Sequence, residues 1–314
     1  MNLHTNTAIF EELISVTSIN LNLPPSAVRR DYYLVMLLHN LSMSEFAESV
    51  VFKGGTSISK CYPGIINRFS EDIDLTYIPS SNSTNKTISK TLKNIEKAMV
   101  LNAFSEKLVD ERNERNKSRL VWFEKDNIEE SKVKIEIGSS IKPEPYSKKV
   151  LKSYIHEHLE MHGFFSDITE YDLKEFSLNV LNIERTFIDK IFAVKRHAIC
   201  GSLPRKVRHI YDVVQMMKHD EIRKFLEDKS RLKEIIKITK ETDLFYLTKR
   251  KNQPFYNSLE LFCFHEWKHK FNDETKANYE KLNESILYSK EKQHVEEAVI
   301  VFNTINTLFM ELGE

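Results

Sequence analysis

One stretch, residues 50–78, constrains the fold of this 314-residue chain more than any other. An apolar run at 50–52 predicts a short strand, and residues 56–61 are typical of the start of a helix. Between them stands the only pair of adjacent glycines, Gly54 and Gly55. Glycine has no Cβ atom, so backbone N–H groups in such a turn can approach a phosphate closely at the start of the helix. The order therefore predicts a strand, a phosphate-binding turn and a helix.

The same stretch ends in a segment with alternating acidic and apolar side chains, EDIDLTYI at residues 71–78. A strand has a period of two residues, so Asp72 and Asp74 point to the same side with Cα atoms about 6 to 7 Å apart. Two such carboxylates can hold Mg²⁺, with Mn²⁺ as the alternative ion, beside a substrate phosphate. The same alternation also occurs on an ordinary solvated strand. The neighbouring glycine turn favours the metal-binding interpretation.

A third carboxylate is expected from another strand, KVKIEIG at residues 132–138. Glu136 lies on the polar side of this strand, whose other side is apolar. We expect it to bind a second metal ion or to activate an attacking hydroxyl group. A further strand is predicted at residues 118–124.

The rest of the chain has mainly helical spacing, which together with the strands predicts an α+β fold with a small mixed sheet. Ser26 is the expected N-cap of the second helix. We expect a first domain at 1–200 and a mostly helical domain at 201–314, after a break near 201–204. Helices are predicted at residues 7–20, 26–47 and 88–109, and over most of the chain from residue 183.

Composition narrows the class of protein. Hydrophobic residues make up 41% of the chain, enough for an ordinary buried core, and no apolar run reaches the roughly 18 residues needed to span a membrane. Lys+Arg and Asp+Glu both number 46, so the net charge gives no indication of a nucleic-acid partner. The three cysteines lack metal-ligand spacing. We therefore expect a cytoplasmic protein in a reducing setting, with no structural zinc and no membrane partner.

The motifs resemble a known family. VFKGGTSISKCY followed by RFSEDIDLTY resembles the AbiEii/AbiGii toxin family of nucleotidyltransferase-like proteins, distant members of the DNA polymerase beta superfamily. ERTFIDKIFAVKRHA and RKVRHIYDVVQM follow in the family's order, so the resemblance covers about residues 25–217. It implies a polymerase-beta-like nucleotidyltransferase core, flanked by N-terminal helices and a C-terminal helical domain.

The resemblance also implies roles for residues. Asp72 and Asp74 would hold the metal, Lys190 would contact the triphosphate, and Asp212 would complete the catalytic site. Apart from the resemblance, the position of Arg68 and Ser70 just before the acidic strand suggests that they order the loop or contact phosphate. The nucleotide-phosphate loop would consist of Gly54, Gly55, Thr56 and Ser57.

Lys190, Asp212 and Arg68 could each have an ordinary structural role instead. The ammonium group of Lys190 could extend into water from a helix surface. Asp212 could pair with Arg208, one helical turn earlier, and Arg68 could form a surface ion pair with Glu71.

By this resemblance the chain is a Mg-dependent nucleotidyltransferase with NTP as substrate, and the toxin of a toxin-antitoxin or abortive-infection system with a cognate antitoxin. The acceptor would be RNA, for example the 3′ end of tRNA. Basic residues at 195–209, and at 229–251 around Phe245, would suit an RNA groove, although such runs are usually solvated helix faces. A protein or small-molecule acceptor, or a non-catalytic nucleotide- or RNA-binding relative, are the alternatives.

Overall fold

The computed structural model describes residues 1–68, 70, 72–247, 256–285, 287 and 292–314. These residues form two compact units: Met1–Cys61 with Phe69–Val180, and Tyr62–Arg68 with Leu181–Glu314. The units therefore divide near residue 180, whereas the sequence predicted a boundary at residue 200. The helix at 183–199 belongs to the second unit because it packs against the helices that follow it.

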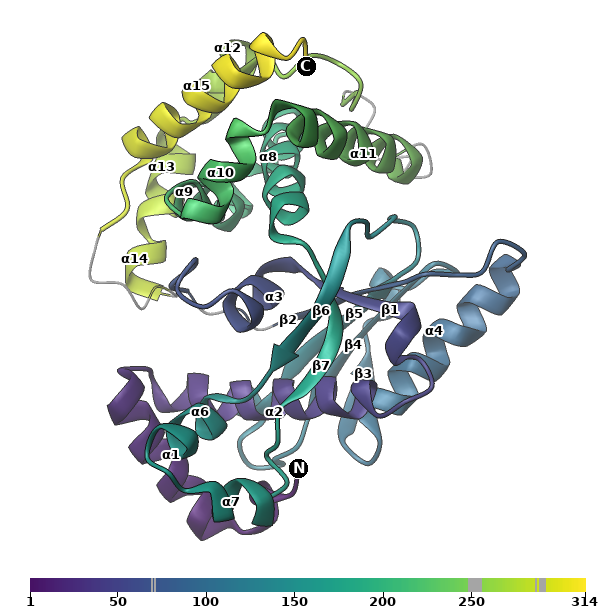
Figure 1. The fold of residues 1–314 in the computed structure, drawn as a ribbon, viewed down its shortest axis with the longest axis vertical. Coiled ribbons are helices and arrows are strands. Elements are labelled where there is room, and N and C mark those ends of the chain that lie inside the picture. Colours follow the sequence, from purple (N-terminus) through teal and green to yellow (C-terminus); the bar gives the residue numbers. More distant parts are fainter. Residues whose placement is uncertain (69, 71, 248–255, 286, 288–291) are drawn as a thin grey trace. The chain divides into compact units, whose positions relative to one another are not determined.

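The first unit is built on one seven-stranded mixed sheet with the order β3-β4-β5-β2-β1-β7-β6 (Figure 1). The central strand β2 is antiparallel to β1 and parallel to β5, and β1 is parallel to β7. β4 is antiparallel to both β3 and β5. The strands are β1 (Val50–Lys53), β2 (Asp72–Tyr77), β3 (Phe104–Lys107), β4 (Asn116–Trp122), β5 (Val133–Gly138), β6 (Tyr146–Leu151) and β7 (Phe176–Leu181).

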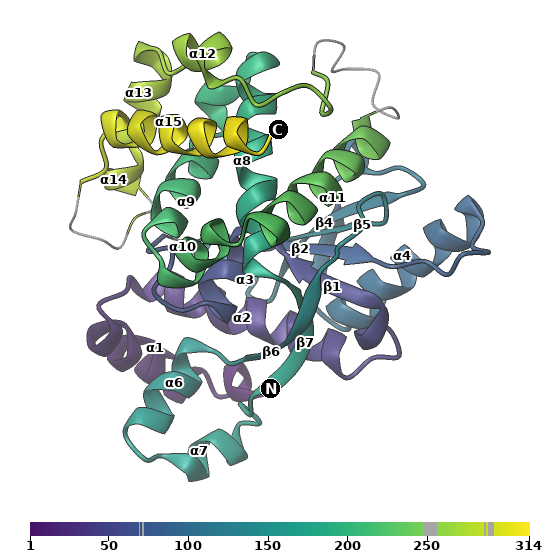
Figure 2. The ribbon, with the colours of Figure 1, turned by 45° about the horizontal axis from the view of Figure 1, so that its top comes forward.

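Helices α2 and α4 pack against one another and against this sheet, where both contact β5 (Figures 1 and 2). They bury apolar residues of α4 such as Leu92 and Ile95, and the sheet contributes fully buried residues such as Ile135. The α-helices of this unit are α1 (Thr7–Leu21), α2 (Pro25–Ser42), α3 (Gly54–Cys61), α4 (Asn85–Val100), α5 (Ile128–Ser131), α6 (Tyr154–Met161) and α7 (Phe165–Glu170). Its short 3-10 helices are Leu3–Thr5, Ala47–Ser49 and Val109–Glu111.

The second unit consists of helices around an aromatic core. Phe262, Phe264, Trp267, Phe302 and Phe309 are buried and pack ring against ring. In Figures 1 and 2, α15 lies beside α12 and α13. The helices are α8 (Ile183–Ile199), α9 (Arg208–Met217), α10 (Asp220–Glu227), α11 (Lys229–Leu247), α12 (Phe264–Trp267), α13 (Asp273–Glu280), α14 (Leu282–Ser285) and α15 (Val295–Glu311), with 3-10 turns at Leu203–Arg205 and Lys268–Lys270.

The α+β class and the mixed sheet are confirmed, as are the strands predicted at 50–52, 71–78, 118–124 and 132–138, within one or two residues at each described end. Several helix boundaries were wrong. α2 begins at Pro25 after an N-cap at Pro24 instead of Ser26, and it ends at Ser42.

The helix predicted at 88–109 stops at Val100, where Leu101 adopts a positive φ of 46°, and the chain then turns into β3. The sequence also did not predict β6 and β7, because their periodicity is short and irregular. Across the described residues, no helix is both long and apolar enough to cross a membrane.

Candidate active site

The turn between β1 and α3 lies directly against an acidic side chain of β2. Gly54 begins α3 with a φ of +85°, in the region that favours glycine. A Cβ atom at this position would lie only 2.3 Å from Oδ2 of Asp74. Glycine is therefore required at this turn for two reasons, its backbone conformation and the closeness of the Asp74 carboxylate.

Three carboxylates share one face of the sheet. In β2, Asp72 and Asp74 are partly exposed while Ile73 between them is fully buried. β2 and β5 run parallel with Asp74 directly beside Glu136. Residues paired across neighbouring strands point to the same side, so all three acidic side chains project from the face opposite the buried one.

The donor set suits a hard divalent cation, because carboxylate oxygens are the ligands that Mg²⁺ and Mn²⁺ prefer. Glu136 is, however, engaged elsewhere: its Oε1 lies 2.5 Å from Nζ of Lys134, which also lies 2.8 Å from Oε2 of Glu111. Burial disfavours the charged form of Lys134, but these two carboxylates outweigh it and raise its pKa. The carboxylates of Asp72 and Asp74 have the chemistry of metal ligands, and Glu136 would have to leave Lys134 to act as a further ligand.

The hydroxyl groups of the turn hold it to the acidic strand. Oγ1 of Thr56 lies within hydrogen-bonding distance of the Asp72 carbonyl oxygen and of the Ser70 hydroxyl, and Ser57 donates to the Gly54 carbonyl oxygen at 2.9 Å. Both side chains are almost fully buried. Their hydroxyls are consequently committed to the turn itself, so a phosphate would meet backbone N–H groups here.

Asp212, in the second unit, is fully buried between two cations. Arg68 donates to both of its carboxylate oxygens, at 2.6 and 2.8 Å, and Lys190 donates to one of them at 2.6 Å. Burial alone would raise the pKa of Asp212, but the charges of Arg68 and Lys190 outweigh it and hold that pKa well below its usual range. The three residues form a buried cluster with one surplus positive charge.

This cluster decides between the alternatives that the sequence left open. Lys190 is buried and ion-paired, so its ammonium does not extend into water. Within the described residues, Asp212 forms ion pairs with Arg68 and Lys190 instead of with Arg208. Glu71, the alternative partner of Arg68, lies outside the described residues.

Residues 36–296 match the family described as nucleotidyl transferase AbiEii toxin, type IV TA system. The chain belongs to this family. Its resemblance to AbiEii/AbiGii toxins is thereby confirmed, and the protein is a nucleotidyltransferase of a toxin-antitoxin family.

Two solved structures are similar to this AbiEii-family chain. JHP933 from Helicobacter pylori has 20% sequence identity and a TM-score of 0.38, over 83% of this chain and 95% of that one. The nucleotidyltransferase toxin MenT4 from Mycobacterium tuberculosis H37Rv has 15% identity and a TM-score of 0.46, over 95% of this chain and 98% of that one. No curated protein matches the sequence.

The basic residues expected to form an RNA groove in this AbiEii-family protein are largely used inside the second unit. Lys195 is buried and donates to the Leu261 carbonyl oxygen at 2.7 Å, and Arg196 pairs with Asp243 at 2.9 Å. Within the stretch at 229–251, lysines and arginines of α11 pair with acidic residues, and residues 248–251 lie outside the described part of the chain. Only Arg205, Lys206 and Arg208 remain exposed around the α8–α9 junction.

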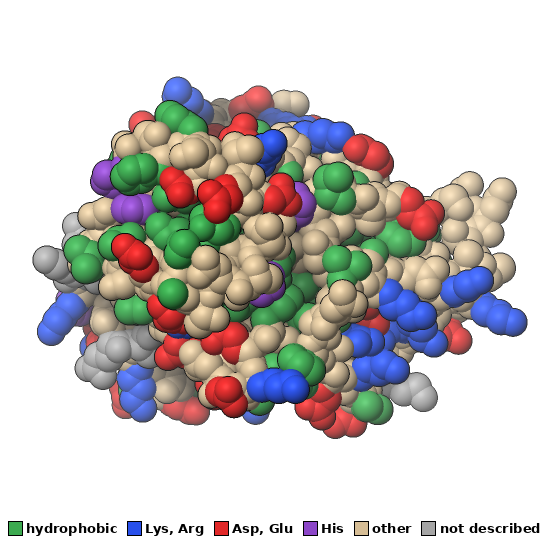
Figure 3. Space-filling view, turned by 90° about the horizontal axis from the view of Figure 1, so that it is seen from below, with side chains coloured by type: hydrophobic (Ala, Val, Ile, Leu, Met, Phe, Trp, Pro, Cys, Tyr) green, Lys and Arg blue, Asp and Glu red, His purple; other side chains and the backbone are tan. Residues whose placement is uncertain are grey.

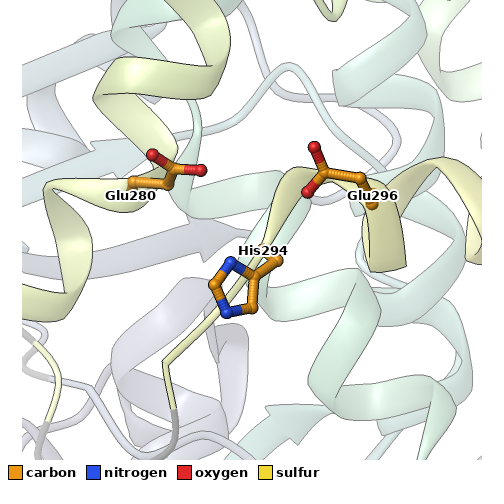
Figure 4. A group of neighbouring side chains, drawn as sticks. All are labelled: Glu280, His294 and Glu296. Atoms are coloured by element: carbon orange, nitrogen blue, oxygen red, sulfur yellow. The ribbon is translucent and has the colours of Figure 1, made fainter.

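A different group of side chains, far along the sequence, also has metal-ligand chemistry. Glu280, His294 and Glu296 have ligand atoms within 4.8 Å of one another, the only such group among the described residues (Figure 4). Nζ of Lys276 lies 2.7 Å from Oε1 of Glu296 and 4.0 Å from Oε1 of Glu280. Because this ammonium already pairs with the glutamates, we interpret the group as an ion-pair cluster of the surface.

Sequence reasoning missed two features of the protein. It did not pair Arg68 with Asp212, because 144 residues separate them and no local spacing encodes such a contact. It also missed four lysines of α4, at positions 86, 90, 93 and 97. Their spacing of four, three and four residues is a helical stripe and could have revealed them.

Proposed function

We propose that this AbiEii-family protein transfers a nucleoside monophosphate from an NTP to an RNA hydroxyl group in a reaction that depends on Mg²⁺. The observation that carries the proposal is the packing of the Asp74 carboxylate against Gly54, with Asp72 on the same face of β2. A metal held by these carboxylates would lie next to the turn whose backbone N–H groups can receive the phosphates. Asp72 and Asp74 would hold Mg²⁺ or Mn²⁺, which when bound neutralises negative charge on the phosphates.

The reaction exchanges one phosphorus–oxygen bond for another. An RNA hydroxyl oxygen, such as that at the 3′ end of a tRNA, bonds to the α-phosphorus of the NTP. The bond from that phosphorus to the oxygen of the β-phosphate breaks, and pyrophosphate leaves. Glu136, which forms an ion pair with Lys134, accepts the proton of the attacking hydroxyl.

Arg68 and Lys190 supply positive charge for the triphosphate in this proposal. Both are fixed by Asp212, which acts as a positioning residue because its carboxylate already binds the two cations. Thr56 and Ser57 hold the shape of the turn, while Gly54 and Gly55 leave its backbone accessible.

The biological setting we propose is that of a toxin held in check by a cognate antitoxin. The support for it is family membership. Adding nucleotides to an RNA such as tRNA would block its use in translation, which accounts for toxicity without any further activity.

The test is to incubate the protein with total RNA and each of the four labelled NTPs, with Mg²⁺, with Mn²⁺ or with EDTA. An Asp72→Asn/Asp74→Asn variant removes the metal ligands at nearly constant shape. The matched control is Glu106→Gln/Asp110→Asn, which removes two exposed acids of the same unit.

We expect labelled RNA with the native protein and with the control, and none with the Asp72/Asp74 variant or in EDTA. Mn²⁺ binding measured by electron paramagnetic resonance should be lost in the same variant. Equal labelling by the Asp72/Asp74 variant would refute the two-aspartate site. Label on a protein or on a small molecule would replace RNA as the acceptor.

A further inference from the structure

Helix α4 carries a stripe of exposed lysines along one side, Lys86, Lys90, Lys93 and Lys97. Residues three and four apart lie on the same side of a helix, so the four ammonium groups form one row. At 1.5 Å per residue, the row extends over about 16 Å. We call this row the α4 lysine stripe.

Within the described ranges, the four lysines of the α4 lysine stripe form no ion pair and no side-chain hydrogen bond. Helix α11 provides the contrast, because its exposed lysines are engaged: Lys229 with Glu311, Lys237 with Glu241, and Lys233 with the Leu312 carbonyl oxygen.

Other basic residues lie near the stripe. Burial and the charges of Arg112 and Lys93 lower the pKa of Lys117, against the opposite effect of Glu96 and Glu114. Arg115 donates to the side chain of Asn85 at the start of α4. In Figure 3, lysine and arginine side chains gather on the side of the first unit where α4 lies.

The tertiary structure excludes one common use of a basic amphipathic helix, which is to lie on a membrane with its apolar face in the lipid. In α4 that face is already buried: Ile88, Leu92, Ile95 and Met99 are at most 2% exposed. The lysine row lies on the solvent-exposed side of the helix, together with the uncharged Thr87 and Asn94. The chemistry that fits it is a row of negative charges in water, such as the phosphates of a nucleic acid.

The direction of the stripe relates it to the carboxylates of the same unit. α4 follows β2 in the chain and contacts β4 and β5, so it returns along the sheet toward the end at which Asp72 begins β2. A strand of nucleic acid lying along the stripe from Lys86 to Lys97 is therefore led toward that end of the sheet.

We propose that the α4 lysine stripe, on the face of the sheet opposite the carboxylates, binds the sugar-phosphate backbone of the RNA acceptor, so that the RNA end passes over the end of the sheet at which Asp72 begins β2. This rests on the proposed function for the identity of the acceptor. Such backbone contacts set affinity without reading sequence. The stripe accordingly acts on RNA binding and leaves the chemical step to other residues.

The test compares Lys90→Gln/Lys93→Gln/Lys97→Gln with Lys229→Gln/Lys233→Gln/Lys237→Gln. Both variants remove three exposed lysines at helical spacing, so the change in net charge is identical. Binding of bulk tRNA and of oligouridine is measured as a function of salt concentration. Each phosphate contact contributes about 0.7 to 0.9 to the slope of log K against log salt.

We expect the α4 variant to lower that slope by about 2 to 3, and the α11 variant to leave it within about 0.5 of the native value. In the labelling assay, the α4 variant should raise the KM for RNA while kcat at saturating RNA stays near the native value. An equal decrease of the salt slope in the α4 and α11 variants would overturn the proposal, since it would mean that only net charge matters. Equal loss of affinity for polyglutamate and RNA would overturn it in favour of an acidic protein partner.

The two proposals can fail separately. If RNA is labelled but the α4 variant binds and labels it as the native protein does, the stripe proposal fails and the proposed function stands. If the α4 variant lowers the salt slope of RNA binding but no NTP labels RNA, the proposal of nucleotide transfer to RNA fails, while RNA binding by the stripe is supported.

Discussion

The contact between Gly54 and Asp74 makes the replacement Gly54→Ala a direct test of the acidic site. The new Cβ atom would lie 2.3 Å from Oδ2 of Asp74, while ordinary contact begins near 3.4 Å, so the carboxylate or the turn has to move by about 1 Å. Mg²⁺ requires near-ideal octahedral geometry, and a 1 Å displacement of a reacting group can lower a rate about 100-fold. We expect transfer activity to fall by about 100-fold or more.

The effect on stability should be much smaller. An L-residue at a positive φ costs about 1 to 2 kcal/mol, and replacing glycine recovers about 0.4 to 1 kcal/mol by restricting the unfolded chain. The free energy of unfolding should therefore change by about 1 kcal/mol, measured by urea denaturation. Transfer of label from NTP and Mn²⁺ binding by electron paramagnetic resonance measure the site itself.

The matched control is Gly163→Ala in the same unit. Gly163 has nearly the same φ, +78°, but no atom lies within 4 Å of the position of its added Cβ. It should lose similar stability and keep native activity and Mn²⁺ affinity. If Gly54→Ala retained activity within a few-fold of native, or if Gly163→Ala lost as much, the reasoning that Asp74 must stay against the turn would be refuted.

Three further predictions concern the buried charges. Asp212→Ala leaves two cations buried without their counter-ion and should lower the free energy of unfolding by about 3 to 5 kcal/mol; a loss under about 1 kcal/mol in urea titrations would contradict the buried cluster. Burial lowers the pKa of His197 to about 4 and that of His209 well below its usual value, so both are neutral when folded and take up protons below about pH 6.5 when unfolded. The stabilisation that these neutral histidines contribute should therefore be fully present above about pH 6.5 and should be lost as the pH falls toward 4. Thermal melting should show this loss, and the melting temperature of a His197→Gln/His209→Gln variant should fall less over the same pH range. Nζ of Lys60 lies 2.7 Å from Oδ1 of the buried Asp31. Lys60→Met leaves that carboxylate without its partner, so it should destabilise the protein more than the double change Lys60→Met/Asp31→Asn does. Equal decreases of the denaturation midpoint in the two variants would argue against a coupled pair.

Local patterns in the sequence determined the elements that carry the candidate site. The alternation in β2 fixes which side Asp72 and Asp74 occupy, since successive side chains of a strand point to opposite faces. The apolar run and the glycine pair likewise marked the turn from β1 into α3. These features were predictable because each depends on residues within a few positions of one another.

Helix ends and irregular strands were less predictable for the same reason. The stop of α4 at Val100 depends on a backbone turn at Leu101, and β6 and β7 are defined by pairing within the sheet more than by their own periodicity. Tertiary hydrogen bonding selects such segments from several local conformations of similar energy.

Only the tertiary structure decided which charged side chains meet. It buried Lys190 and Arg68 on Asp212 and paired exposed lysines of α11 with acidic groups or a carbonyl oxygen. The lysine stripe of α4 has no acidic partner among the described residues. It also brought Asp74 against Gly54, 20 positions away in the chain. The physical reason is that periodicity fixes the direction of a side chain, whereas its partner, its burial and hence its charge state are fixed by elements distant in sequence.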